Sequence, residues 1–193
     1  MKKRTAFLGA ILSLITLVQP LLIRTGFFLS SFAVIISFSE KVNAETAKFY
    51  FDRGFQKGEQ GDYYGAISDF TKAIEINPAD SVSFYNRGWN LGSLKDYYGA
   101  ISDYTKVIDI NPKAADAYLN RGYAKDELKD YYGAISDYNK ALEIDPRYSK
   151  AYKNRSISKE SIGDIKGACL DANKAVSLGD TASDNQSWIK KNC

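Results

Sequence analysis

Apolar residues recur along the middle of the chain with the spacing of an α-helix that has one buried face. Ala66, Ile67, Phe70, Ala73 and Ile74 fall at i, i+1, i+4, i+7 and i+8, which places them on one stripe of a helix. The same spacing is found twice more, in the sets Ala100, Ile101, Tyr104, Val107, Ile108 and Ala134, Ile135, Tyr138, Ala141, Leu142. The pattern predicts equivalent helices that each pack against a core through this stripe.

The predicted helices belong to a longer repeat. The segment Asp-Tyr-Tyr-Gly-Ala-Ile-Ser-Asp occupies 62–69, 96–103 and 130–137, at a constant interval, and a degraded copy begins one interval later at Asp164. A fixed period of about 34 residues indicates one supersecondary unit stacked on itself. A single unit would leave its apolar face in water, whereas stacking buries a continuous core and requires a cap on the last unit.

The turns between helices are also marked in the sequence. Asn-Pro or Asp-Pro pairs end the first three units at Pro78, Pro112 and Pro146, and a residue before proline is biased away from helix. Asp180 stands at the corresponding place in the fourth unit, so the array is predicted to stop there. Within each unit, an aspartate precedes the second helix and is expected to accept hydrogen bonds from its free N–H groups: Asp62, Asp96, Asp130 and Asp164.

These units resemble the tetratricopeptide repeat, a helix–turn–helix of about the same length. The first unit has the family's early aromatic residue, its small residue four positions later and its Ala-x-x-x-aromatic pattern, as Tyr50, Gly54, Ala66 and Phe70. The resemblance implies an all-α, right-handed superhelical solenoid over 45–180, with repeats at 47–80, 81–114, 115–148 and 149–180 and a capping helix at 181–193. Two positions depart from the family: arginine replaces the leucine before the small residue, and the tyrosine three residues after it is Lys57, Leu91, Lys125 or Lys159.

Residues 1–44 have the features of an export signal or a membrane anchor. Residues 2–4 are basic, 5–23 and 25–38 are largely apolar, and Val42 and Ala44 provide small residues for a cleavage site. The first apolar run is long enough to span a bilayer and the second is short for a span, so cleavage after Ala44 and retention as an anchor both stay open. With the basic end held inside, both place the repeats outside the cytoplasm, whereas a two-span hairpin would return them to it.

Charge and composition exclude several classes of function for the repeats. Residues 45–193 contain 21 Lys or Arg and 22 Asp or Glu, so they lack the basic footprint of a nucleic-acid-binding protein. The chain has no histidine, which removes the commonest metal ligand and most acid–base catalysts near neutral pH. The sequence has no phosphate-binding loop, nucleophile elbow or metal-ligand cluster. We therefore expect no enzyme activity, no cofactor and no metal.

An arginine and an aspartate recur at a constant separation in every unit. The arginine lies on the first helix and the aspartate on the second, which predicts an ion pair between the two helices, with a bidentate geometry that suits arginine. The alternative is that both are solvated surface charges of negligible energy. The predicted pairs are Arg53–Asp69, Arg87–Asp103, Arg121–Asp137 and Arg155–Asp171.

The C-terminal segment contains the features of a cap. Trp188 and Ile189 stand among polar residues, and we expect a short helix that lays Trp188 on the exposed end of the fourth unit. Cys169 and Cys193 are the two cysteines of the chain. In an oxidising compartment they would form a disulfide, and the alternative is one buried and one exposed free thiol.

In the tetratricopeptide architecture the first helices line a concave groove, into which the second, fifth, sixth and ninth residues of each unit face. The resemblance implies a groove that carries aromatic residues beside asparagines: Phe51, Phe55, Tyr85, Asn86, Trp89, Leu119, Asn120, Tyr123, Asn154 and Ile157. Asparagine offers a donor and an acceptor, as an extended peptide requires, and aromatic rings give contact area. The alternative is that these are ordinary packing residues. The family's carboxylate clamp, which holds chaperone C-termini, needs lysine at the fifth place and asparagine at the ninth, and the first three units have neither.

The sequence therefore favours a non-catalytic interaction scaffold outside the cytoplasm. We expect it to bind an extended peptide or a partner helix in its groove and to assist assembly of an exported or membrane complex. The alternative is a structural repeat protein that self-associates and has no groove ligand. Nucleic acid is not expected as a partner, and membrane contact is expected only through the N-terminal segment.

Overall fold

The computed structural model describes residues 28–180 and 183–193, which form nine α-helices and no strand. The helices are α2 (Phe28–Glu59), α3 (Tyr63–Ile76), α4 (Ser81–Ser93), α5 (Tyr97–Ile110), α6 (Ala115–Glu127), α7 (Tyr131–Ile144), α8 (Ser149–Ser161), α9 (Ile165–Ser177) and α10 (Ser183–Asn192). The all-α prediction is confirmed.

The chain divides into two compact units, Met1–Glu45 and Thr46–Cys193. The apolar run at 5–23, on which the export-signal and anchor predictions depend, lies outside the described residues. Among the helices of the described part, none combines the length and the hydrophobicity that crossing a membrane requires. Residues 39–45, the polar end of the N-terminal segment, are part of α2.

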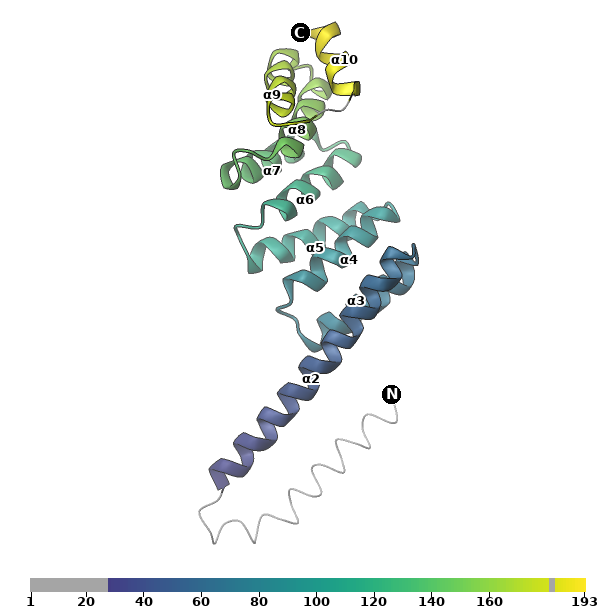
Figure 1. The fold of residues 1–193 in the computed structure, drawn as a ribbon, viewed down its shortest axis with the longest axis vertical. Coiled ribbons are helices and arrows are strands. Elements are labelled where there is room, and N and C mark those ends of the chain that lie inside the picture. The colour runs from purple at the N-terminus through teal and green to yellow at the C-terminus, as the bar shows by residue number, and fades with distance from the viewer. Residues whose placement is uncertain (1–27, 181–182) are drawn as a thin grey trace. The chain divides into compact units, whose positions relative to one another are not determined.

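From Thr46 onward the helices form a stack of hairpins in chain order (Figure 1). Each helix from α3 to α9 packs against the next one along the chain, and α10 packs against α9. First helices of neighbouring hairpins also meet, α4 with α6 and α6 with α8. This arrangement of consecutive helical hairpins is a solenoid.

Aspartates begin the second helices as the sequence predicts. The side chains of Asp62, Asp96, Asp130 and Asp164 each accept a hydrogen bond from the backbone N–H three residues later, at 2.9–3.0 Å. The residue before each aspartate has a positive φ, which glycine supplies at Gly61 and Gly163. Lys95 and Lys129 adopt φ values of 63° and 64° at the equivalent places, a conformation that is unfavourable for a side chain with a Cβ.

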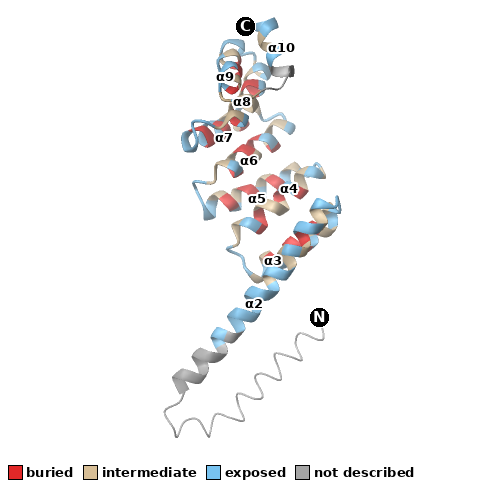
Figure 2. Cartoon of the chain, in the orientation of Figure 1, coloured by how far each residue is buried: buried red, intermediate tan, exposed pale blue. Residues whose placement is uncertain are grey.

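The core is a layer of small and aromatic residues between the helices of each hairpin and the next (Figure 2, red). Ala66, Phe70 and Ala73 of α3 are almost completely buried, and the equivalent residues of α5 and α7 are buried too. Close approach within a hairpin depends on the small residue of the first helix. At Gly122, an added Cβ would lie 2.7 Å from Cε1 of Tyr138, so glycine is what allows the tyrosine ring to pack there.

Candidate functional site

The two helices of every hairpin are joined by an arginine–aspartate pair. Nε and Nη2 of Arg53, Arg87, Arg121 and Arg155 donate to the two carboxylate oxygens of Asp69, Asp103, Asp137 and Asp171, at 2.5–2.9 Å. All four aspartates are buried. The structure thus places each predicted pair in direct bidentate contact.

Each arginine also contacts residues beyond its aspartate. Its guanidinium lies over the aromatic ring three residues earlier, as Arg87 does over Phe84 at 5.5 Å. In α4, α6 and α8 its Nη1 donates to the preceding hairpin: Arg87 to Thr71 Oγ1 at 3.0 Å, Arg121 to Thr105 Oγ1 at 3.1 Å and Arg155 to Asn139 Oδ1 at 2.6 Å. One side chain therefore connects three helices of two neighbouring hairpins.

A lysine four residues after the arginine is a second cation on the same aspartate in three of the four hairpins. Lys57, Lys125 and Lys159 place Nζ 2.7–2.8 Å from their carboxylates. In the second hairpin this position is Leu91, and Asp103 is held by Arg87. Hydrogen bonds from Arg53 and Lys57 lower the pKa of Asp69 to about 2. The sequence signal for the lysine was its separation of four from the arginine, which puts both on one helix face.

The ninth residues of the four hairpins form a stripe of partly exposed apolar and aromatic side chains, one on each first helix. Phe55, Trp89, Tyr123 and Ile157 are 46%, 50%, 49% and 51% exposed. We call the surface of α2 (from Thr46), α4, α6 and α8 that carries these four residues the inner face. The ring of Tyr63 from α3 meets Trp89 edge-on at 6.2 Å between centroids, which holds the indole in place. These side chains have the exposure that contact with a partner requires.

The fifth residues do not all reach the inner face. Leu119 is 7% exposed and packs in the core with Tyr138 and Ala151, so its assignment to the groove was wrong: the aliphatic chain is taken up by the core between hairpins. Phe51 is partly buried against Phe70 at 5.6 Å between centroids. Phe51 also stacks on the ninth residue Phe55, with 6.5 Å between ring centroids.

The asparagines of the sixth positions are partly engaged within the protein. Asn86 Nδ2 donates to the carbonyl of Val82 in its own helix at 2.8 Å, and Asn120 Nδ2 donates to the hydroxyl of Tyr85 at 2.7 Å. Asn154 interacts with the hydroxyl of Tyr138. One donor of each side-chain amide is thus used within the protein, which leaves fewer polar groups for a ligand than the sequence suggests.

Two hollows lie on the inner face, one on each side of Trp89. The first hollow has a volume of about 310 Å³ between α2, α3 and α4, and its lining includes Phe55, Glu59, Phe70, Tyr85, Trp89 and Asn90. The second hollow, of about 290 Å³, is bounded by α4, α5 and α6, and its lining includes Trp89, Tyr97, Tyr104, Asn120 and Tyr123. Volumes at the lower end of the range for ligand pockets suit single side chains of a bound chain.

Buried polar groups differ between the hairpins. Asn90 is 3% exposed, its Nδ2 donates to the carbonyl of Asn86 at 2.7 Å, and its Oδ1 has no hydrogen-bond partner among the described residues. Asp126 instead accepts hydrogen bonds from Tyr138 at 2.6 Å and Ser158 at 2.8 Å. Burial raises the pKa of the Asp126 carboxyl. The unpaired amide oxygen of Asn90 was not found from the sequence.

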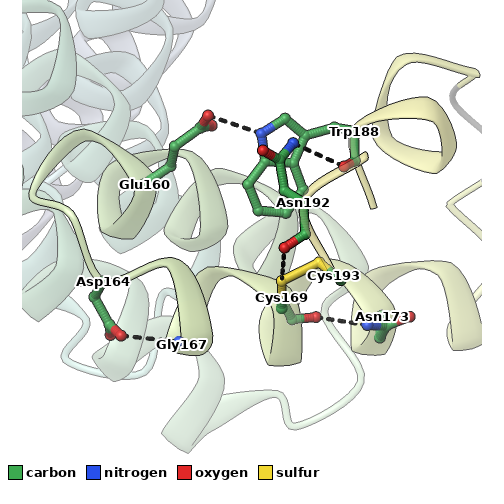
Figure 3. The surroundings of a disulfide bond; sticks show 8 residues. All are labelled: Glu160, Asp164, Gly167, Cys169, Asn173, Trp188, Asn192 and Cys193. Atoms are coloured by element: carbon green, nitrogen blue, oxygen red, sulfur yellow. Dashed lines mark hydrogen bonds between the residues drawn. A yellow bond between two sulfur atoms is a disulfide. The ribbon is translucent and has the colours of Figure 1, made fainter. Parts of the chain in front are cut away.

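At the C-terminus, α10 is fastened to the last hairpin (Figure 3). Trp188 is partly buried and its Nε1 donates to Glu160 Oε1 of α8 at 2.7 Å. A disulfide joins Cys169 of α9 to Cys193. Of the two alternatives for the cysteines, the structure contains the bridge.

No set of three or more His, Cys, Asp or Glu side chains in the described part of the chain is placed to hold a metal ion.

Comparison with known proteins identifies the repeats. Family models described as tetratricopeptide repeat match residues 47–80, 82–114 and 115–148, together just over half of the chain. No curated protein matched the sequence.

Several solved structures share the fold. The TPR domain of OM64 from Arabidopsis is 27% identical with a TM-score of 0.60, over 62% of this chain and 98% of that one. The first TPR domain of Spaghetti (RPAP3), bound to the HSP90 peptide SRMEEVD, has the same identity and TM-score over 62% and 95%. MamA (41-end) from Desulfovibrio magneticus RS-1 is similar in fold at 24% identity, with a TM-score of 0.66 over 71% and 77%. The chain belongs to the tetratricopeptide repeat family.

Proposed function

We propose that this protein is a non-catalytic scaffold that binds an extended peptide or a partner helix along its inner face. The observation that carries the proposal is the stripe of Phe55, Trp89, Tyr123 and Ile157, each about half exposed. Large rings that are held in place and open to solvent on one side are typical of binding surfaces. The similarity to a TPR domain bound to a peptide supports this type of interaction.

The ligand is expected to differ from the peptide in that complex. A carboxylate clamp needs lysine at the fifth and asparagine at the ninth place, and this chain has Phe51, Tyr85 and Leu119 at the fifth place of its first three units. We therefore expect the acidic peptide SRMEEVD to bind weakly or not at all.

We place the repeats outside the cytoplasm, where the scaffold would assist assembly of an exported or membrane complex. The basic start, the apolar runs and the small residues Val42 and Ala44 support export. The bridge between Cys169 and Cys193 supports an oxidising compartment. Alkylation of thiols in intact cells tests this: both cysteines should resist modification until a reductant is added, and two free thiols would contradict the placement.

Binding is tested by capture of partners from an extracytoplasmic extract with the wild-type chain and two variants. Trp89→Ala removes the central ring of the inner face and should abolish capture. Tyr64→Ala removes an exposed aromatic ring from α3, away from both hollows, and should leave capture unchanged. Equal capture by the wild type and Trp89→Ala would overturn the proposal.

One observation favours the alternative of self-association. Tyr64, Tyr98 and Tyr132 on the second helices are 74–76% exposed at regular intervals. If they join copies of the chain, light scattering should show a mass that rises with concentration and falls in Tyr98→Ser. A monomer at all concentrations would exclude this function.

A further inference from the structure

We propose that the first hollow receives the side chain of a lysine or arginine from a basic peptide segment. The inference rests on the proposed function, because it names the kind of segment that the inner face binds. It is independent of the acidic-peptide binding that the family's carboxylate clamp provides.

Aromatic rings form much of the wall of the first hollow. Phe55 comes from α2, Phe70 from α3, and Tyr85 and Trp89 from α4. Phe70 is fully buried, whereas half of Trp89 and nearly half of Phe55 are open to solvent. The faces of such rings carry partial negative charge and attract ammonium or guanidinium groups. The apolar stem of lysine or arginine can pack on the same rings.

Two of the polar groups in the lining of the first hollow are acceptors that could bind a cation. Glu59 contributes an exposed carboxylate at the end of α2. Asn90 contributes Oδ1, which is buried and has no partner in the described chain. Because Nδ2 of Asn90 donates to the carbonyl of Asn86, the amide orientation is fixed and the oxygen is turned toward Gly58. A buried acceptor without a donor is unfavourable, and a cationic side chain would supply that donor.

Gly58 lies close to this oxygen, so a side chain at position 58 would be crowded against it. An added Cβ at position 58 would lie 3.0 Å from Asn90 Oδ1. The glycine is itself part of the lining of the first hollow.

The surrounding charge favours a basic ligand over an acidic one. No lysine or arginine lines either hollow in the described structure. The nearby Lys57 is bound to Asp69. Beside the second hollow, Glu127 accepts a hydrogen bond from Tyr97 at 3.0 Å, which adds a further carboxylate along the inner face. The carboxylates of Glu59 and Glu127 would repel an acidic segment.

The test uses the full chain in a neutral detergent and four pools of immobilised random decapeptides. The pools differ only in the central residue, which is lysine, arginine, norleucine or glutamate. At about 150 mM salt, where long-range charge effects are screened, the lysine and arginine pools should retain about tenfold more protein than the norleucine pool. The glutamate pool should retain least.

Three variants test whether the preference for lysine over norleucine arises in the first hollow. Glu59→Gln and Asn90→Leu should each reduce the lysine-to-norleucine ratio by at least about threefold. Glu75→Gln makes the same charge change on an exposed part of α3 and should leave the ratio unchanged. Thermal unfolding of each variant shows that it is folded, and Asn90→Leu should unfold at a temperature no lower than the wild type.

Failure of this inference is distinguishable from failure of the proposed function. If Trp89→Ala loses binding but the four pools bind the wild type equally, the inner face binds peptides and the cation site is refuted. If the lysine preference falls equally in Glu75→Gln and Glu59→Gln, it reflects net charge and the inference is also refuted. If Trp89→Ala binds every pool as well as the wild type, both proposals fail.

Discussion

Buried polar atoms are paired in one region of the molecule and unpaired in another. The paired ones are in the arginine–aspartate ion pairs of the hairpins, which we call the junctions, and the unpaired one is in the first hollow. At the junctions, both oxygens of Asp69 or Asp137 accept hydrogen bonds from arginine and lysine. In the first hollow, the amide oxygen of Asn90 is equally buried and has no partner in the described chain. A polar group that is fully paired within the protein stabilises the fold. One left unpaired destabilises the fold, and we propose that a cation from the ligand pairs with it.

The largest expected effect is the loss of an arginine where no second cation is present. Arg87→Met should lower the free energy of unfolding by about 3–5 kcal/mol, because it leaves the buried charge of Asp103 without its partner. Arg121→Met should have a smaller effect, since Lys125 still contacts Asp137. Urea denaturation measures both, and equal losses would show that the lysines do not contribute.

Acid should weaken the junctions next. The pKa of Asp69 is about 2 in the folded chain and 3.8 when unperturbed. A lowered folded pKa contributes stability above the unfolded value, and this stability is lost as the pH falls from about 4 to about 2. For Asp69 the loss is on the order of 2 kcal/mol. The slope of unfolding free energy against pH should be smaller in Asp69→Asn, and an unchanged slope would contradict the pairing.

A smaller effect of opposite sign is expected in the first hollow. Asn90→Leu removes an unpaired buried oxygen and should raise the free energy of unfolding by about 1 kcal/mol. The matched control is Ser158→Ala at the equivalent position of the fourth hairpin, where the hydroxyl donates to Asp126. This change should destabilise the protein by about 1 kcal/mol. A loss of stability in both variants would mean that Asn90 is as fully paired as Ser158.

The smallest effect concerns strain within a hairpin rather than pairing. Lys95 has a φ of 63°, and glycine adopts this conformation without steric strain. Lys95→Gly should be stabilising by about 0.5 kcal/mol, with the flexibility gained by the unfolded chain offsetting part of the relief. Gly61→Lys should produce the reverse change in the first hairpin.

The fold could be predicted from the sequence because each of its determinants is local or periodic. The constant interval between the repeated segments, the prolines and the aspartates before the second helices identify the units and their turns. The strain at Lys95 and Lys129 also had a signal, since Gly61 and Gly163 occupy the same place in the other units.

Less of the candidate site than of the fold could be predicted from the sequence. The arginine–aspartate pairs were predicted because the same separation between the two residues occurs in all four units. Leu119 was misplaced because a position in a repeat does not determine whether a neighbouring hairpin covers the side chain. The unpaired oxygen of Asn90 lies close to Gly58 of a different hairpin, and no pattern along one helix reveals such a contact.

Nη1 of the arginines in the junctions limits how neighbouring hairpins can move relative to each other. Because Arg87 Nη1 reaches Thr71 and Arg121 Nη1 reaches Thr105, swinging one hairpin against its neighbour would break a hydrogen bond of a buried ion pair. The solenoid should therefore resist bending between neighbouring hairpins. The separation between Phe55, Trp89 and Tyr123 is then set before any partner arrives, and a partner must match that spacing rather than impose its own.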